Sequence, residues 1–178
     1  MLLEVARRAL ARAAEGREAR EDLPESEALK EPAGAFVTLR KHGRLRGCVG
    51  QLPSREALVE VVAYCARAAA LEDPRFKPVL AEEVAEMEVE VSVISALEDI
   101  SADRIETGKH GLVVGKGRQH GVLLPQVAAE HAWTAQRFLE ETCSKAGLEP
   151  DAWKDPATRI QAFTAEVFSE SDFESDDE

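Results

Sequence analysis

The alternation of apolar and polar residues between Glu86 and Val93 constrains the fold most strongly. Met87, Val89, Val91 and Val93 alternate with Glu86, Glu88, Glu90 and Ser92. A period of two predicts a β-strand with one face buried and one face in water. The chain is therefore expected to fold around a sheet.

Two further segments predict β-hairpins. The β-rich runs 35–40 and 44–49 are joined by His42-Gly43, a plausible tight turn because glycine tolerates positive φ. Pairing across this turn would place Cys48 opposite Val37. A second hairpin is predicted over residues 112–124, with a glycine-rich, basic tip.

Helices are expected between and around these strands. Residues 2–20 predict an amphipathic helix, and residues 21–31 predict a polar connector. A second helix is expected to begin with Ser54 as N-cap and to end before Pro74, and a third to run from Thr134 to Gly147. Residues 159–168 predict a closing strand. Strands and helices alternate without a repeated strand-helix-strand unit. We therefore expect an α+β fold, with a mostly antiparallel or mixed sheet flanked by helices.

The size of the chain suits one domain or two small interlocked lobes. It has 178 residues, of which 44% are hydrophobic. Residues 1–168 form the predicted domain, and the Ser/Asp/Glu-rich residues 169–178 predict a disordered tail. No apolar run approaches the ~20 residues of a membrane helix, and a secretory signal is absent, so we expect a cytoplasmic protein.

A local basic run stands out against the formal net charge of -12. Residues 40–55 contain five Lys/Arg residues and no acid. This composition predicts a site for one small anionic group, with Arg44 and Arg46 as ligands. The negative net charge disfavours broad nucleic-acid binding. The alternative is nucleic-acid binding through Lys41, Arg44 and Arg46, which predicts an affinity that falls steeply with salt concentration.

Cys48 is the candidate catalytic residue. It lies between Gly47 and Gly50, which would let the backbone approach a ligand closely. Arg44 and Arg46 would stabilise its thiolate and lower its pKa. The alternative interpretation is a buried strand cysteine whose neighbouring glycines serve tight packing.

The other cysteines carry no predicted chemistry. Cys65 and Cys143 fall on the buried stripes of their helices and are expected in the core. The three cysteines form no CxxC pair, so reduced thiols are expected. No ligand spacing predicts a metal site, and no motif predicts a cofactor. The oligomeric state stays open.

Two further residues are candidate ligand contacts. In Asp73-Pro74-Arg75-Phe76, Arg75 is either part of a structural turn or a clamp whose guanidinium matches a carboxylate or phosphate. Gln126, which follows Pro125, could supply an amide to a ligand.

Four segments resemble the signature blocks of the AMMECR domain family. They are Leu45-Arg46-Gly47-Cys48-Val49-Gly50, Asp73-Pro74-Arg75-Phe76, Leu123-Leu124-Pro125-Gln126-Val127 and Cys143-Ser144-Lys145-Ala146-Gly147-Leu148. The resemblance covers roughly residues 2–168. It implies a two-lobed protein with the first block at or near a cleft.

The resemblance also implies partners, because similar bacterial and archaeal proteins of the AmmeMemoRadiSam system protein A type are associated with Memo-like and radical S-adenosylmethionine proteins. It implies no reaction. Three functions therefore stay open: a Cys/Arg/Gly-lined cleft for an anionic ligand or partner segment, with or without thiol-dependent catalysis; a non-catalytic adaptor for such a partner; and a nucleic-acid-associated regulator.

Overall fold

The chain is organised as two units. The computed structural model describes residues 1–17, 23–24 and 26–173. The first unit contains Met1–Ile94 and Glu166–Glu178, and the second contains Ser95–Ala165. Each unit has helices and one four-stranded sheet, and every strand pair with a described register is antiparallel. The α+β prediction is therefore confirmed.

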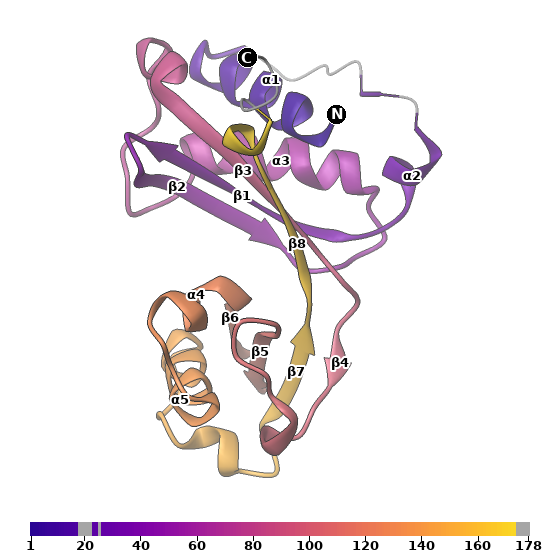
Figure 1. The fold of residues 1–178 in the computed structure, drawn as a ribbon, viewed down its shortest axis with the longest axis vertical. Helices are drawn as coiled ribbons and strands as arrows, with labels where there is room; N and C mark the ends of the chain where they lie inside the picture. The colour runs from indigo at the N-terminus through magenta and orange to yellow at the C-terminus, as the bar shows by residue number, and fades with distance from the viewer. Residues whose placement is uncertain (18–22, 25, 174–178) are drawn as a thin grey trace. The chain divides into compact units, whose positions relative to one another are not determined.

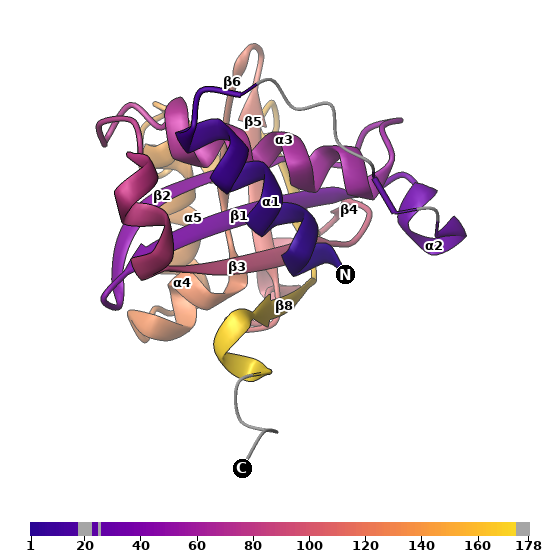
Figure 2. The ribbon, with the colours of Figure 1, turned by 90° about the horizontal axis from the view of Figure 1, so that it is seen from above.

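The first unit is built on a sheet with strand order β2-β1-β3-β8. Its strands are β1 (Gly34–Lys41), β2 (Arg44–Gln51), β3 (Met87–Ile94) and β8 (Ala165–Ser169). Its helices are α1 (Leu2–Ala14), α2 (Glu27–Lys30) and α3 (Leu58–Leu71), with the 3-10 helices η1 (Ala81–Glu86) and η4 (Glu170–Asp172). The helices α1 and α3 lie on the same face of this sheet (Figures 1 and 2).

The helix-covered face forms the core of the first unit. Small residues of α1 and α3 let both helices pack closely against valines and leucines of β1 and β3, and side chains such as Leu10, Val37, Val61 and Val89 are 0% exposed. The strand predicted from the alternation is β3, in which Val89 and Val91 are buried while Glu88 and Glu90 are half-buried on the other face.

The second unit has a sheet of order β4-β7-β5-β6. Its elements are β4 (Glu98–Asp99), η2 (Ala102–Arg104), β5 (Gly111–Lys116), β6 (Gln119–Leu123), α4 (Pro125–Glu130), α5 (Ala135–Lys145), η3 (Ala152–Lys154) and β7 (Arg159–Phe163). Phe138, Leu139 and Cys143 of α5 pack with Leu112 and Val114 of β5. The side chain of Thr134 caps α5, and Gly147 follows its end with φ 73°, as predicted.

The register of the first hairpin differs from the prediction by one residue. Cys48 lies opposite Thr38, and Gly47 lies opposite Leu39. A β-bulge between Leu39 and Arg40 inserts Arg46 as an extra residue, so simple counting from the turn fails beyond this point. Cys48 consequently lies on the face of the sheet opposite to that of Val37.

Two helix boundaries also differ. The first helix ends at Ala14 rather than at residue 20, because Gly16 has φ 67° and breaks the helical path; residues 18–20 lie outside the described residues. The second long helix begins at Leu58 with Ala57 as N-cap, whereas the Ser54 hydroxyl accepts a hydrogen bond from the Glu56 N–H in the preceding turn.

The predicted closing strand is two strands in different sheets. It divides at Thr164, whose N–H and C=O both bond to Ser95. The predicted disordered tail also differs, because β8 continues to Ser169 and Glu170 binds Arg7 and the N–H of Val89. Residues 174–178 lie outside the described residues.

Candidate functional site

Two of the five Lys/Arg residues in the run 40–55, Lys41 and Arg46, form ion pairs with acids that lie far away in the sequence. Glu83 and Glu86 of η1 lie against the run: Lys41 is 3.5 Å from a carboxylate oxygen of each, and His42 Nε2 lies 2.8 Å from Glu86 Oε2. The run is therefore acid-free along the chain but not in space.

Arg46 forms intramolecular hydrogen bonds. Its Nε and Nη2 donate to the two carboxylate oxygens of Glu83 at 3.3 and 3.0 Å, and Nη1 donates to the Lys77 carbonyl at 2.9 Å. The Arg46 side chain is only 16% exposed. Its hydrogen bonds, followed by that from the Leu80 N–H, lower the pKa of Glu83 to about 2. Arg46 is thus a structural residue in this geometry.

Cys48 occupies a polar, partly buried position on β2. Its N–H donates to Asp73 Oδ2 at 2.9 Å, and the Thr38 hydroxyl donates to Sγ at 3.4 Å. Burial raises the pKa of the Cys48 thiol, and this effect exceeds the lowering by the Thr38 hydrogen bond and the charge of Arg75. The predicted lowering of the thiol pKa is therefore wrong, because desolvation exceeds the effect of nearby guanidinium charge.

Arg75 is held beside Cys48 by a buried carboxylate. Its Nε and Nη2 donate to Asp73 Oδ1 and Oδ2 at 3.0 and 2.7 Å, and Nη2 also lies 3.5 Å from the Cys48 carbonyl. The Asp73 side chain is 3% exposed, and Arg75 lowers its pKa to about 2. The guanidinium carbon also lies 5.5 Å from the centre of the Phe76 ring.

The outer edge of the Arg75 guanidinium faces solvent. The side chain is 51% exposed, and Nη1 donates to no acceptor within the described part of the chain. Among the basic residues that contact the Cys48 segment, Arg75 thus differs from Arg46, whose donors are buried against protein oxygens.

The two signature glycines are explained by packing. A Cβ on Gly47 would lie 2.2 Å from the Ala69 carbonyl oxygen of α3. A Cβ on Gly50 would lie 2.0 Å from the ring of Phe36. Both positions exclude a side chain because β2 approaches its neighbours closely, so their geometry supports the packing interpretation rather than ligand contact.

The remaining predicted residues lie outside this cluster. Arg44 is exposed at the start of β2, and Gln126 is half-buried on α4 of the second unit. Thr38 and Arg75 donate hydrogen bonds to Cys48, and the Cys48 N–H donates to Asp73, so these three partners all lie in the first unit. The structure thus joins Cys48 to Arg75 and leaves Arg46, Arg44 and the glycines in other roles.

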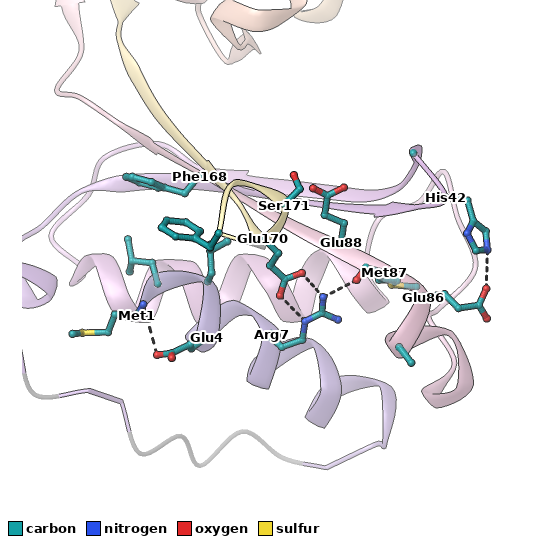
Figure 3. Close-up of a pocket in the computed structure, with 15 residues that line it drawn as sticks. Met1, Glu4, Arg7, His42, Glu86, Met87, Glu88, Phe168, Glu170 and Ser171 are labelled. Atoms are coloured by element: carbon teal, nitrogen blue, oxygen red, sulfur yellow. Dashed lines mark hydrogen bonds and ion pairs between the residues drawn. The ribbon is translucent and has the colours of Figure 1, made fainter. Parts of the chain in front are cut away.

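A second carboxylate-arginine pair, which the sequence did not suggest, lies at β3. Glu170 of η4 accepts hydrogen bonds from Nε and Nη2 of Arg7 (Figure 3). It also accepts one from the N–H of Val89 at 2.8 Å. Arg7 also donates to the carbonyls of Val84 and Met87 at 2.9 and 2.6 Å. No local pattern signals this pair, because 163 positions separate its members.

Comparisons with known proteins identify relatives along almost the whole chain. The family model described as AMMECR1 matches residues 3–168. A curated protein of Methanothermobacter thermautotrophicus, called only "Protein", is 43% identical over 157 residues, which cover 84% of this chain and 81% of that protein. Protein TK0174 of Thermococcus kodakarensis is 44% identical, with 84% and 78% covered.

A solved structure is also similar. The crystal structure of the uncharacterized protein PH0010 from Pyrococcus horikoshii matches with a TM-score of 0.87 and 41% identity, covering 94% of this chain and 89% of that one. Separately, none of the helices among the described residues is long and apolar enough to span a membrane.

Proposed function

The chain belongs to the AMMECR1 family, and we propose that it is a binding module in which Arg75 captures an anionic group. The group is a carboxylate or phosphate, carried by a small ligand or by a segment of a partner protein. The observation that carries this proposal is the half-exposed guanidinium of Arg75, which the buried Asp73 carboxylate holds from one side.

The arrangement supports binding because the guanidinium is preorganised. Two hydrogen bonds to Asp73 and the adjacent Phe76 ring restrict the Arg75 side chain before any ligand arrives. A restricted side chain loses less conformational entropy on binding. The outward Nη1 is then available for a charge-assisted hydrogen bond to an anionic oxygen.

The signature segment has a supporting role in this proposal. The Cys48 N–H holds Asp73, and Asp73 in turn holds Arg75. Because burial raises the pKa of the Cys48 thiol, the thiol is neutral at physiological pH and is a poor nucleophile. The contacts therefore favour binding over thiol-dependent catalysis.

The experiment is a calorimetric titration of the full chain with inorganic phosphate and, separately, with acetate. Wild type is expected to bind at least one anion saturably, and Arg75→Ala is expected to lose at least tenfold in affinity. The matched control is Arg67→Ala, because Arg67 is 43% exposed and pairs with Glu72 at 2.7 Å. Equal affinity of wild type and Arg75→Ala would contradict the proposal.

The identity of the carrier is tested with a partner. The family resemblance predicts Memo-like or radical S-adenosylmethionine proteins, and an acidic side chain of such a protein would fit Arg75. A pull-down of a purified Memo-like protein by wild type, Arg75→Ala and Arg67→Ala separates the two carriers. Selective loss with Arg75→Ala supports a partner segment, whereas retention together with lost phosphate or acetate binding supports a small ligand.

A further inference from the structure

A separate pocket lies in the first unit. It has a volume of about 1020 Å³ and is bounded by the start of α1, the β1–β2 turn, the junction of η1 with β3, and the β8–η4 segment (Figure 3). Neither Cys48 nor Arg75 lines it. It is therefore independent of the site proposed above.

The apolar part of the pocket includes large side chains that face solvent. Met1 and Phe173 line it and are 64% and 65% exposed, and the half-buried Phe168 adds further apolar surface. Several large apolar side chains gathered around one hollow are typical of an interaction surface rather than of scattered exposed residues.

The charged part of the pocket is predominantly acidic. Glu4, Glu86, Glu88 and Glu170 line it, whereas the cationic groups among the described lining residues are the Arg7 guanidinium and the Met1 ammonium, which lies 3.6 Å from Glu4. Arg7 is already engaged by Glu170 and two backbone carbonyls. Its guanidinium is consequently not available to an incoming anion.

Glu88 is the carboxylate most suited to an incoming cation. It is half-buried, and the described residues provide it with no ion pair or hydrogen bond, as Figure 3 shows for the residues drawn. Arg40 lies opposite Glu88 in the β1–β3 register, but no ion pair within 4.0 Å joins them. A partly buried carboxylate without a partner is stabilised when a ligand supplies a positive charge.

We infer that this pocket docks a segment of a partner protein that carries large apolar side chains together with lysine or arginine. The acidic lining of the pocket favours lysine or arginine in the partner segment, and the exposed side chains of Met1 and Phe173 favour large apolar residues in it. A volume of about 1020 Å³ is at the upper end of the roughly 300–1,000 Å³ of small-molecule pockets and accommodates several side chains.

The test uses NMR titration of the full chain with a short synthetic peptide of leucine and lysine. The matched peptide carries glutamate at every lysine position, and butylammonium serves as a small cation. The inference expects saturable binding of the leucine-lysine peptide, with amide shifts concentrated on residues that line the pocket, and no binding of the acidic peptide. Shifts concentrated elsewhere, or equal binding of both peptides, would overturn it.

Two pairs of variants separate this pocket from general attraction to an acidic protein. Glu88→Gln is expected to lower the affinity for the leucine-lysine peptide about fivefold. Glu60 is exposed on α3 and lies outside the pocket, so Glu60→Gln is expected to leave this affinity unchanged. Phe173→Ala is likewise expected to weaken peptide binding. Leu80 is 60% exposed but does not line the pocket, so Leu80→Ala is expected to leave peptide binding unchanged.

Equal losses within either pair would overturn the inference. So would butylammonium if it reproduced the same amide shifts with the same affinity as the peptide, because the pocket would then be a site for small amines.

Discussion

Two carboxylate-arginine pairs bond to strands of the first sheet in closely similar ways. Asp73 accepts the N–H of Cys48 on β2 and is held by Arg75, while Glu170 accepts the N–H of Val89 on β3 and is held by Arg7. In each pair a carboxylate oxygen accepts the hydrogen bond of a strand N–H, in the role that a backbone carbonyl of a neighbouring strand has elsewhere in a sheet.

The pairs differ in what the arginine does with its other donors. Arg7 is 31% exposed and bonds to Glu170 and to two backbone carbonyls, so it joins α1, η1, β3 and η4. Arg75 is 51% exposed and has an outward Nη1. The comparison indicates that the same bonding pattern stabilises the fold at Arg7 and presents a cation to solvent at Arg75.

The largest expected effect is on stability, from Arg7→Ala. The change removes the cationic partner of a partly buried carboxylate and one donor from each of two backbone carbonyls, so the free energy of unfolding is expected to fall by about 3 kcal/mol. Arg75→Ala is expected to cost only about 1 kcal/mol, because the buried Asp73 carboxylate keeps the backbone N–H groups of Cys48 and of position 75 as donors and the lost side chain is half exposed. Urea denaturation measures both.

The exposed neighbour Arg8 provides the control for α1, and Arg8→Ala is expected to change stability by less than about 0.5 kcal/mol. Equal costs for Arg7→Ala and Arg75→Ala would remove the distinction between the two pairs.

A smaller loss is expected from Asp73→Ala. The N–H groups of Cys48 and Arg75 would both lose their acceptor, at a cost of about 2 kcal/mol in unfolding free energy. Anion binding should weaken together with stability, because Arg75 would no longer be held in place. Thermal unfolding and phosphate calorimetry on one sample test this coupling; full anion affinity in folded Asp73→Ala would contradict it.

The acid dependence of stability sharpens the role of Asp73 further. Its pKa is lowered from 3.8 to about 2, so the stability it contributes is complete above 3.8 and disappears as the pH falls through about 2. Asp73→Asn should therefore flatten the loss of unfolding free energy in this range. The pKa of Glu83 is also lowered to about 2, so Glu83 should account for part of the pH dependence of the unfolding free energy that remains in Asp73→Asn.

Denaturant titrations across this pH range, on Asp73→Asn and on Asp73→Asn combined with Glu83→Gln, measure these contributions. An unchanged slope in both variants would show that the two ion pairs do not set the acid limit.

The smallest expected effect is on the thiol. Burial raises the pKa of Cys48 above the ordinary 9.0, so the pH midpoint of its alkylation by iodoacetamide should lie above that value. Arg75→Ala should move the midpoint upward, since the charge of Arg75 lowers this pKa. Mass spectrometry of the labelled peptide follows both midpoints; a midpoint near neutrality would restore the thiolate interpretation.

Local patterns in the sequence were sufficient for much of the fold. The alternation at β3, the turn at His42-Gly43 and the cap at Gly147 each depend on residues that are close in sequence, and each was predicted correctly. The bulge at Arg46 was missed because counting from the turn assumes an unbroken ladder of residue pairs, and no residue near the turn signals the extra residue.

The candidate site was only partly predictable for a related physical reason. The basic run was visible in the sequence, but Glu83, which neutralises Arg46, lies 37 positions away. The sequence also gives the positive neighbours of Cys48 but not its burial, which determines the direction of its pKa shift. Arg75 was predicted as a candidate ligand contact, but its ion pair with Asp73 was not predicted and is seen only in the structure.

The most direct measurement follows the guanidinium signals of both arginines in one sample. In a ¹⁵N NMR titration with inorganic phosphate or acetate, the Nε–H resonance of Arg75 should shift saturably, while that of Arg7 should stay in place. If neither signal moved, or if both moved to the same extent, Arg75 would not be the residue that receives the anionic group.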